Sequence, residues 1–217
     1  MSRDPARAWS RMAFPQRGAA LSVPAPVPVT GPWEVRFAAA GDARQATFGQ
    51  LVPWNEHADP AIKYLSGTAA YRKTVAVPND TLQGDDCRWE LDLGAVPVMA
   101  RVILNGRDVG VLWKTPLRVD VTDAVKAGDN VLEIEVVNLW PNRMIGDEQL
   151  PEDSDRYCNG TLKAWPDWLG KGEPSPAGRQ TFTSWRMWKK DDALLPSGLL
   201  GPVTFRVIPQ VPLSEAR

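Results

Sequence analysis

The sequence is poor in the residues that bind transition metals or form disulfides. Its 217 residues include one histidine, His57, and two cysteines, Cys87 and Cys158. Such a set cannot supply the four cysteines, the two cysteines with two histidines, or the three histidines of the common zinc sites. The spacing of the two cysteines does not decide whether they pair. His57 is open to three interpretations: a partner for a ligand hydroxyl, a proton shuttle, or a plain surface residue.

The sequence also lacks an excess of charge of one sign and lacks long apolar runs. It has 25 basic and 26 acidic residues, so its formal net charge is −1. The sequence has no excess of positive charge with which to bind the phosphates of a nucleic acid. No apolar run approaches the ~18 residues of a membrane-spanning helix. Neither nucleic acid nor membrane is therefore an expected partner.

Helical periodicity is nearly absent, and alternation of apolar and polar residues takes its place. This alternation is typical of strands with one buried and one exposed face in antiparallel sheets. Asn105-Gly106 predicts a two-residue hairpin turn between two such strands. One short helical turn is expected at 121–126. The pattern predicts an all-β jelly-roll β-sandwich of about eight to ten strands, with strands around 71–77, 88–93, 100–104, 109–112, 117–121, 132–136 and 203–207.

The two ends of this pattern suggest the domain organisation. Residues 1–30 contain alternating prolines and no apolar stretch long enough for a secretory signal, and they are expected to form a flexible tail. Residues 31–210 are expected to form the sandwich. No signal peptide is visible in this sequence.

Tryptophan is unusually frequent, with 10 Trp against 8 Phe and Tyr together. Trp33 and Trp89 lie in alternating segments and are expected in the core. The irregular region 138–200 holds further tryptophans and is too rich in aromatics for plain disorder. We expect it to form long loops folded over one edge or face of the sandwich. Its tryptophans are Trp140, Trp165, Trp168, Trp185 and Trp188.

Two sets of segments carry a resemblance to known families. The first set resembles the sugar-binding jelly-roll domain of family 2 glycoside hydrolases, which is galactose-binding-domain-like: 63–73 (KYLSGTAAYRK), 91–94 (LDLG), 100–106 (ARVILNG), 119–122 (VDVT) and 126–130 (KAGDN). The second set is similar to the C-terminal β-sandwich of family 106 α-L-rhamnosidases: 138–148 (NLWPNRMIGDE) and 196–203 (PSGLLGPV).

The resemblance implies a carbohydrate-binding accessory domain of a glycoside hydrolase. The resembled enzymes are much longer and carry their catalytic barrel upstream, so it supplies no catalytic residues for this chain. It implies carbohydrate and a catalytic glycosidase domain or chain as partners, and a periplasmic or extracellular location. Two alternatives stay open: a structural domain that braces a separate catalytic barrel, and a glycosidase in its own right.

Sugar binding would use aromatic faces for stacking and directed polar groups for the hydroxyls. Asn138, Asn142, Arg143 and Asp147 surround Trp140 in sequence. The alternative for Arg143 and Asp147 is an ion pair that ties this loop to the sandwich. The full set of expected sugar-binding residues is Trp113, Asn138, Trp140, Asn142, Arg143, Asp147, Trp165 and Trp168.

An acidic run follows, from Asp147-Glu148 to Asp155. Closely spaced carboxylates in a loop suit Ca²⁺, and Asp153 and Asp155 are the candidate ligands. A carboxylate pair for glycoside hydrolysis is a second interpretation, and a solvated acidic loop is the third. No other cofactor is expected.

Overall fold

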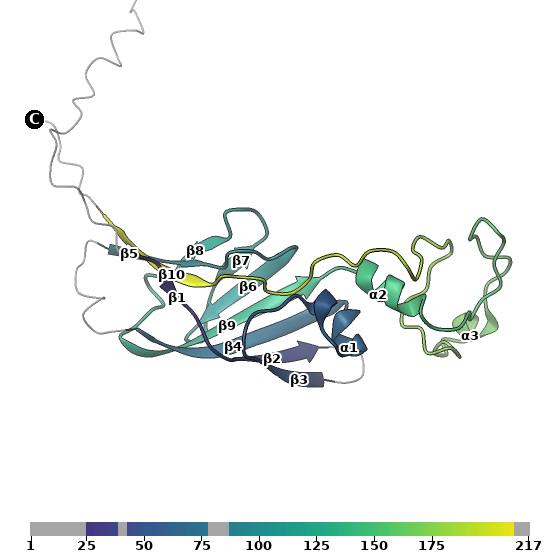
Figure 1. Ribbon diagram of the computed structural model, residues 1–217, viewed down its shortest axis with the longest axis horizontal. Coiled ribbons are helices and arrows are strands. Elements are labelled where there is room, and N and C mark those ends of the chain that lie inside the picture. Colours follow the sequence, from purple (N-terminus) through teal and green to yellow (C-terminus); the bar gives the residue numbers. More distant parts are fainter. Residues whose placement is uncertain (1–24, 39–42, 78–86, 211–217) are drawn as a thin grey trace, which may run out of the picture.

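Ten strands in two antiparallel sheets form the structure, a computed structural model that describes residues 25–38, 43–77 and 87–210 (Figure 1). One sheet has four strands in the order β1-β10-β5-β8, and the other has six in the order β3-β2-β4-β9-β6-β7. The strands are β1 (Val27–Pro28), β2 (Trp33–Ala38), β3 (Ala43–Phe48), β4 (Gly67–Val77), β5 (Cys87–Asp92), β6 (Met99–Leu104), β7 (Arg107–Leu112), β8 (Arg118–Asp120), β9 (Gly128–Asn138) and β10 (Thr204–Pro209). The all-β sandwich predicted from the alternation is confirmed.

The core lies between the two sheets and consists of the inward residues of the alternating strands. In β2 every second residue is buried, and β9 alternates in the same way over most of its length. Trp33 and Trp89 are buried, as expected. The hairpin is also confirmed: Asn105 and Gly106 have φ of 54° and 81° and join β6 to β7, as a turn with two positive φ values requires.

Helices are few and short: η3 (Trp54–Glu56), α1 (Pro60–Lys63), α2 (Pro141–Asp147) and α3 (Asp167–Gly170). The expected helical turn at 121–126 is only a hydrogen-bonded turn, in which the N–H groups of Ala124 and Val125 both donate to the Val121 carbonyl. In the described part of the chain no helix is long and apolar enough to cross a membrane.

The N-terminal boundary of the sandwich differs from the expected one. Residues 1–24 of the predicted tail lie outside the described residues. Val27 and Pro28 pair with Phe205 and Thr204 of β10, and Val29 is buried. These residues therefore belong to the sandwich rather than to a tail.

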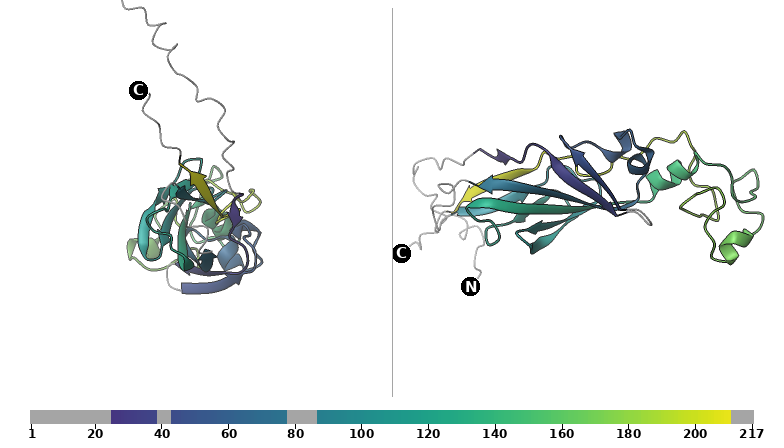
Figure 2. Two further views of the ribbon diagram at one scale, coloured as in Figure 1. Left: turned by 90° about the vertical axis from the view of Figure 1, so that its left-hand side faces the viewer. Right: turned by 90° about the horizontal axis from the view of Figure 1, so that it is seen from below.

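The Trp-rich region does not fold back over a sheet. Figure 1 shows that α2 follows β9 at one end of the sandwich and that the chain then extends away from it, carrying α3 at the far side. The second panel of Figure 2 shows the same extension from below. We call residues 148–195 the arm. The expectation of loops lying on an edge or face of the sandwich is wrong for this segment.

Candidate functional site

Two asparagines at the junction between sandwich and arm hold backbone groups. The Asn138 side-chain amide donates to the Leu65 carbonyl at 2.9 Å. Asn142 is 1% exposed and binds Leu195 twice, accepting from its N–H and donating to its carbonyl, both at 2.8 Å. Asn142 therefore fastens the returning end of the arm to α2, and its amide faces protein rather than solvent.

Arg143 and Asp147 form the ion pair that was the alternative to sugar binding. They are one helical turn apart on α2 and 3.0 Å from each other. Asp147 is buried, and its Oδ2 also accepts from the N–H groups of Gln180 and Thr181 and from the Thr181 hydroxyl. The Arg143 guanidinium lies over the Tyr64 ring. This pair connects sandwich, helix and arm at one point.

A hollow of about 270 Å³ does lie beside Arg143. Arg44, Tyr64 and Gln180 contribute to its wall, and the Nε of Arg143 is buried without a hydrogen-bond partner among the described residues. A hollow with a mostly apolar lining and a few polar groups thus exists at the junction, but Asn138, Asn142 and Asp147 make other contacts.

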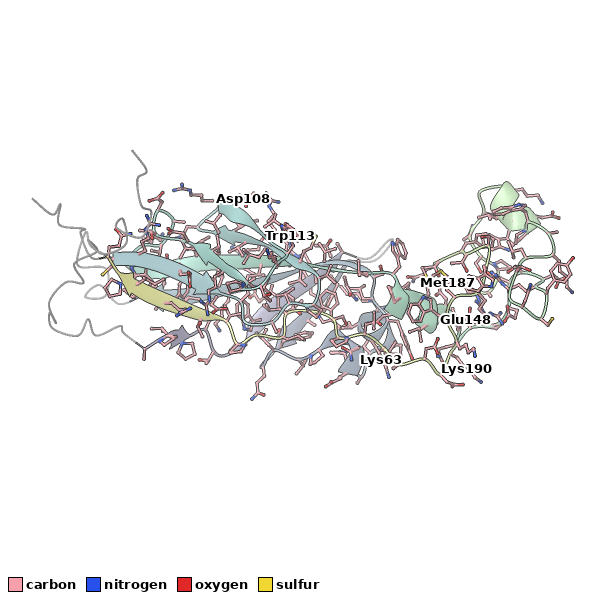
Figure 3. All side chains as sticks on the ribbon, turned by 90° about the horizontal axis from the view of Figure 1, so that it is seen from above. Lys63, Asp108, Trp113, Glu148, Met187 and Lys190 are labelled. Carbon is pink, nitrogen blue, oxygen red and sulfur yellow. The ribbon has the colours of Figure 1, made fainter. Side chains whose placement is uncertain are left out.

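The remaining predicted residues lie elsewhere. Trp113 follows β7 and is 71% exposed on the sandwich, away from Met187 and Glu148 (Figure 3). Trp140 is exposed at the start of α2. Trp165 and Trp168 both pack against Phe182 in the arm. The eight predicted residues are thus divided among the sandwich, the junction and the arm.

Arginines brace the arm from inside. Arg179 binds the carbonyls of Pro151 and Leu150 and pairs with Glu148 at 2.8 Å. Arg186 pairs with Glu148 and with Glu152. These charge-assisted contacts take the place of an apolar core, because no apolar side chain between residues 146 and 198 is buried in the described structure.

Arg156 differs from the other two arginines in its partners. Its guanidinium donates to the carbonyls of Gly160 and Thr183, at 3.1 and 2.7 Å, and makes no ion pair within the described residues. Burial lowers the pKa of Arg156 from its ordinary value, and the nearby charge of Arg186 adds to the effect. The charges of Glu152, Glu148 and Asp153 act in the opposite direction, so Arg156 has carboxylates nearby although its direct hydrogen bonds go to carbonyl groups.

The arm also contains a hollow that the sequence analysis did not anticipate. This arm pocket has a volume of about 620 Å³ and lies between segments 152–160 and 186–189. Tyr157 and Trp188 line it together with charged and amide side chains. The only available signal in the sequence was aromatic residues next to charged ones in two segments that are well separated along the chain.

The other candidate sites have structural explanations. The Asp153 carboxylate accepts from the Ser175 and Ser154 hydroxyls, and the described residues contain no group of three metal-ligating side chains around Asp153 and Asp155 or elsewhere. His57 stacks on Phe48 and accepts from the Asp59 N–H. Cys87 and Cys158 are both free.

Comparisons with known proteins agree with this geometry. Residues 53–199 match a family model described as glycosyl hydrolase 2 galactose-binding domain-like. The chain is 48% identical over 188 residues to a putative beta-glucuronidase of Formosa agariphila, covering 86% of this chain and 16% of that protein. It therefore spans about one sixth of the length of this curated relative.

Solved structures show the same relationship. A rhamnosidase from Novosphingobium sp. PP1Y superposes with a TM-score of 0.70 and 34% identity, over 89% of this chain and 16% of that one. A Bifidobacterium dentium beta-glucuronidase complexed with coumarin-3-O-glucuronide superposes with a TM-score of 0.57 and 22% identity, over 90% and 31%. The second likeness shows the fold alone.

Proposed function

The chain belongs to the glycosyl hydrolase 2 galactose-binding domain-like family, and from this premise we propose that it binds carbohydrate as a non-catalytic accessory domain of a rhamnosidase-like glycoside hydrolase. The observation that carries the proposal is the display of aromatic side chains on a braced arm. Tyr157, Trp165 and Trp185 are each more than half exposed, and the Trp185 indole is fixed by a bond to the Asn159 carbonyl. Fixed aromatic faces suit the C–H faces of sugar rings because little side-chain entropy is lost on binding.

The carboxylates near the junction support a non-catalytic role. Asp147, Glu148 and Glu152 are each paired with an arginine. A glycosidase needs one carboxyl free to donate a proton and a second free to attack or to activate water. These three are held in the bracing of the arm instead.

The proposed ligand, a rhamnose-containing polysaccharide, comes from the similarity to a rhamnosidase. The 34% identity to a rhamnosidase extends over 89% of the chain, which makes rhamnose-containing polysaccharide the first ligand class to test. Because such polymers are met outside the cytoplasm, the proposal includes a periplasmic or extracellular location.

Isothermal titration against rhamnosides and pectic oligosaccharides tests sugar binding. We expect weak, saturable heats at millimolar ligand, and a loss of at least tenfold in affinity when Trp165 and Trp185 are both changed to Ala. The matched control is Leu139→Ala, which removes an exposed apolar side chain outside the arm. Absence of heat with every saccharide, from protein shown to be folded by circular dichroism, would contradict the proposal.

The second candidate function is bracing of a catalytic barrel. It is favoured by the exposed Trp140, Met187 and Leu195, which would suit a protein interface as well as a sugar. Mixing the chain with a rhamnosidase from which the corresponding domain has been removed distinguishes the two functions. Bracing predicts a stable complex in which arm tryptophans are protected from acrylamide quenching, whereas sugar binding alone predicts no complex.

A further inference from the structure

The arm pocket is built by two segments that are fixed to each other. The Arg186 N–H donates to the Gly160 carbonyl at 2.9 Å, and Thr161 and Trp185 form a β-bridge beside it. A tight turn at Tyr157, in which the Gly160 N–H donates to the Tyr157 carbonyl, completes the frame. The walls of the pocket are therefore held in place before any ligand arrives.

Several polar groups that line the pocket have no partner in the described structure. The Asp155 carboxylate, the Lys189 ammonium and the Tyr157 hydroxyl make no hydrogen bond or ion pair there, although all three residues line the hollow. The Asn159 side-chain oxygen accepts from Thr161, but its amide NH2 is free within the same residues. Unused donors and acceptors that line one hollow are what a polyhydroxylated ligand requires.

The charge of the lining favours a negative ligand. Arg156, Arg186 and Lys189 line the pocket against Glu152 and Asp155. Glu152 is already paired with Arg186, whereas Arg156 bonds only to carbonyls. Glu152, Glu148 and Asp153 interact with Arg156 at longer range, but the lining still has three cations against two carboxylates. An incoming anion would balance this excess of positive charge.

The pocket also offers apolar ring surface. Tyr157 is 56% exposed, and Trp188 lines the pocket while half-buried. Met187 lies beside the junction of α2 and the arm in Figure 3 and is largely exposed. The lining thus combines ring faces, hydrogen-bonding groups and a small excess of positive charge in one hollow.

We propose that the arm pocket binds one anionic sugar residue of a polysaccharide, with the carboxylate or sulfate facing Arg156 and Lys189 and the ring against Tyr157 or Trp188. This inference rests on the proposed carbohydrate binding and adds the ligand class and the place. Asp155 and Asn159 would take the ring hydroxyls. A uronate and a sulfated sugar share the required negative charge.

The test uses the full chain and four probes: glucuronic acid, its methyl ester, a sulfated monosaccharide and rhamnose, each titrated calorimetrically. The methyl ester keeps the ring and removes the charge. We expect glucuronic acid or the sulfated sugar to bind at least tenfold more tightly than the ester and rhamnose, with an affinity that falls as salt rises. The anionic probe that binds more tightly shows whether the natural ligand carries a carboxylate or a sulfate.

Variants locate the binding in the molecule. Lys189→Gln and Tyr157→Ala should each lower the affinity for the anionic sugar at least fivefold. Lys171→Gln, an exposed arm lysine outside the pocket, should leave it unchanged and serves as the control for net charge. All three side chains are exposed, and unchanged circular dichroism confirms folding.

Each outcome decides between the two proposals. Binding of rhamnose or neutral oligosaccharides that no pocket variant alters overturns the arm pocket and leaves the accessory function intact. Equal binding of acid and ester overturns the anionic class. No binding of any probe or oligosaccharide overturns both.

Discussion

Tyr71 links three parts of the sandwich through one hydroxyl group. This buried oxygen accepts from the Trp54 indole at 2.5 Å and from the Leu199 N–H at 3.2 Å. It therefore joins β4, η3 and the segment that returns from the arm toward β10. Burial raises the pKa of Tyr71 from 10.0 to about 12, although the two hydrogen bonds act in the opposite direction.

This pKa predicts how stability depends on alkaline pH. Below pH 10 the hydroxyl is neutral in both states, so Tyr71 keeps its full contribution. Between pH 10 and about 12 the unfolded chain loses the proton while the folded chain keeps it. The free energy of unfolding should then fall by up to about 1.4 kcal/mol per pH unit from this residue.

Tyr71→Phe is the matched variant for this prediction. It leaves the Trp54 and Leu199 N–H groups without a partner, and should cost about 1–3 kcal/mol at pH 7. Urea denaturation of both proteins from pH 7 to 12 measures the effect. The difference between them should shrink above pH 10, and a constant difference would show that Tyr71 is not protected from ionisation.

Glycines at the ends of strands show how closely two elements approach. Gly94 and Gly106 both have positive φ, 67° and 81°. A Cβ on Gly94 would overlap the carbonyl group of Gly201, whereas one on Gly106 would meet nothing within 4 Å. The Gly94 contact is where the loop after β5 meets the segment entering β10, through Ala95 and Gly201.

Replacing each glycine by alanine should therefore have different effects on stability. Gly106→Ala should cost about 1–2 kcal/mol from its backbone conformation alone. Gly94→Ala carries that cost and a further cost of about 1–3 kcal/mol from overpacking. Midpoints of urea unfolding compare the two, and equal losses would mean that the backbones separate freely at Gly94.

Local patterns account for which elements could be predicted. Strands β5, β9 and β10 follow from alternation, because one face of each is buried and the other is wet. Helix α2 could not be predicted in this way, since its buried positions include Asn142, Gly146 and Asp147 rather than an apolar stripe. Gly146 is explained only by packing, because a Cβ there would lie 2.6 Å from Tyr64.

The candidate site was harder to predict than the fold. Asn142 and Asp147 are polar residues next to tryptophan, a pattern typical of sugar sites, yet tertiary contacts with Leu195 and Thr181 occupy them. Those partners are distant along the chain, 53 and 34 positions away. Tyr157 and Trp188 come together for the same reason, through bracing that no local pattern reveals.

At the scale of the whole molecule, the sandwich and the arm are stabilised differently. The sandwich has an extensive apolar core, whereas the arm depends on ion pairs and on hydrogen bonds to carbonyls. Segments with few buried apolar contacts open with lower free energies than core strands. The arm should therefore open locally while the sandwich stays folded.

Hydrogen exchange can measure this difference. Amides of residues 148–195 should exchange at least about a hundredfold faster than those of β4 and β9. Asp147→Ala leaves Arg143 without its partner and should speed exchange in the arm about tenfold or more, with β4 and β9 little changed. Asp123→Ala, which removes an exposed ion pair with Arg107, is the control. Uniform acceleration across both parts would show that they unfold as one unit.

The pairing of β1 with β10 affects how this domain can be inserted into a larger protein. Val27 lies opposite Phe205, so the polypeptide enters and leaves the sandwich side by side, at the end away from the arm (Figure 1). Such a module could be inserted into a surface loop of a larger enzyme, because the two ends of the interrupted loop would stay close together. The arm would then point away from the larger enzyme, because it lies at the opposite end of the sandwich from the point of insertion.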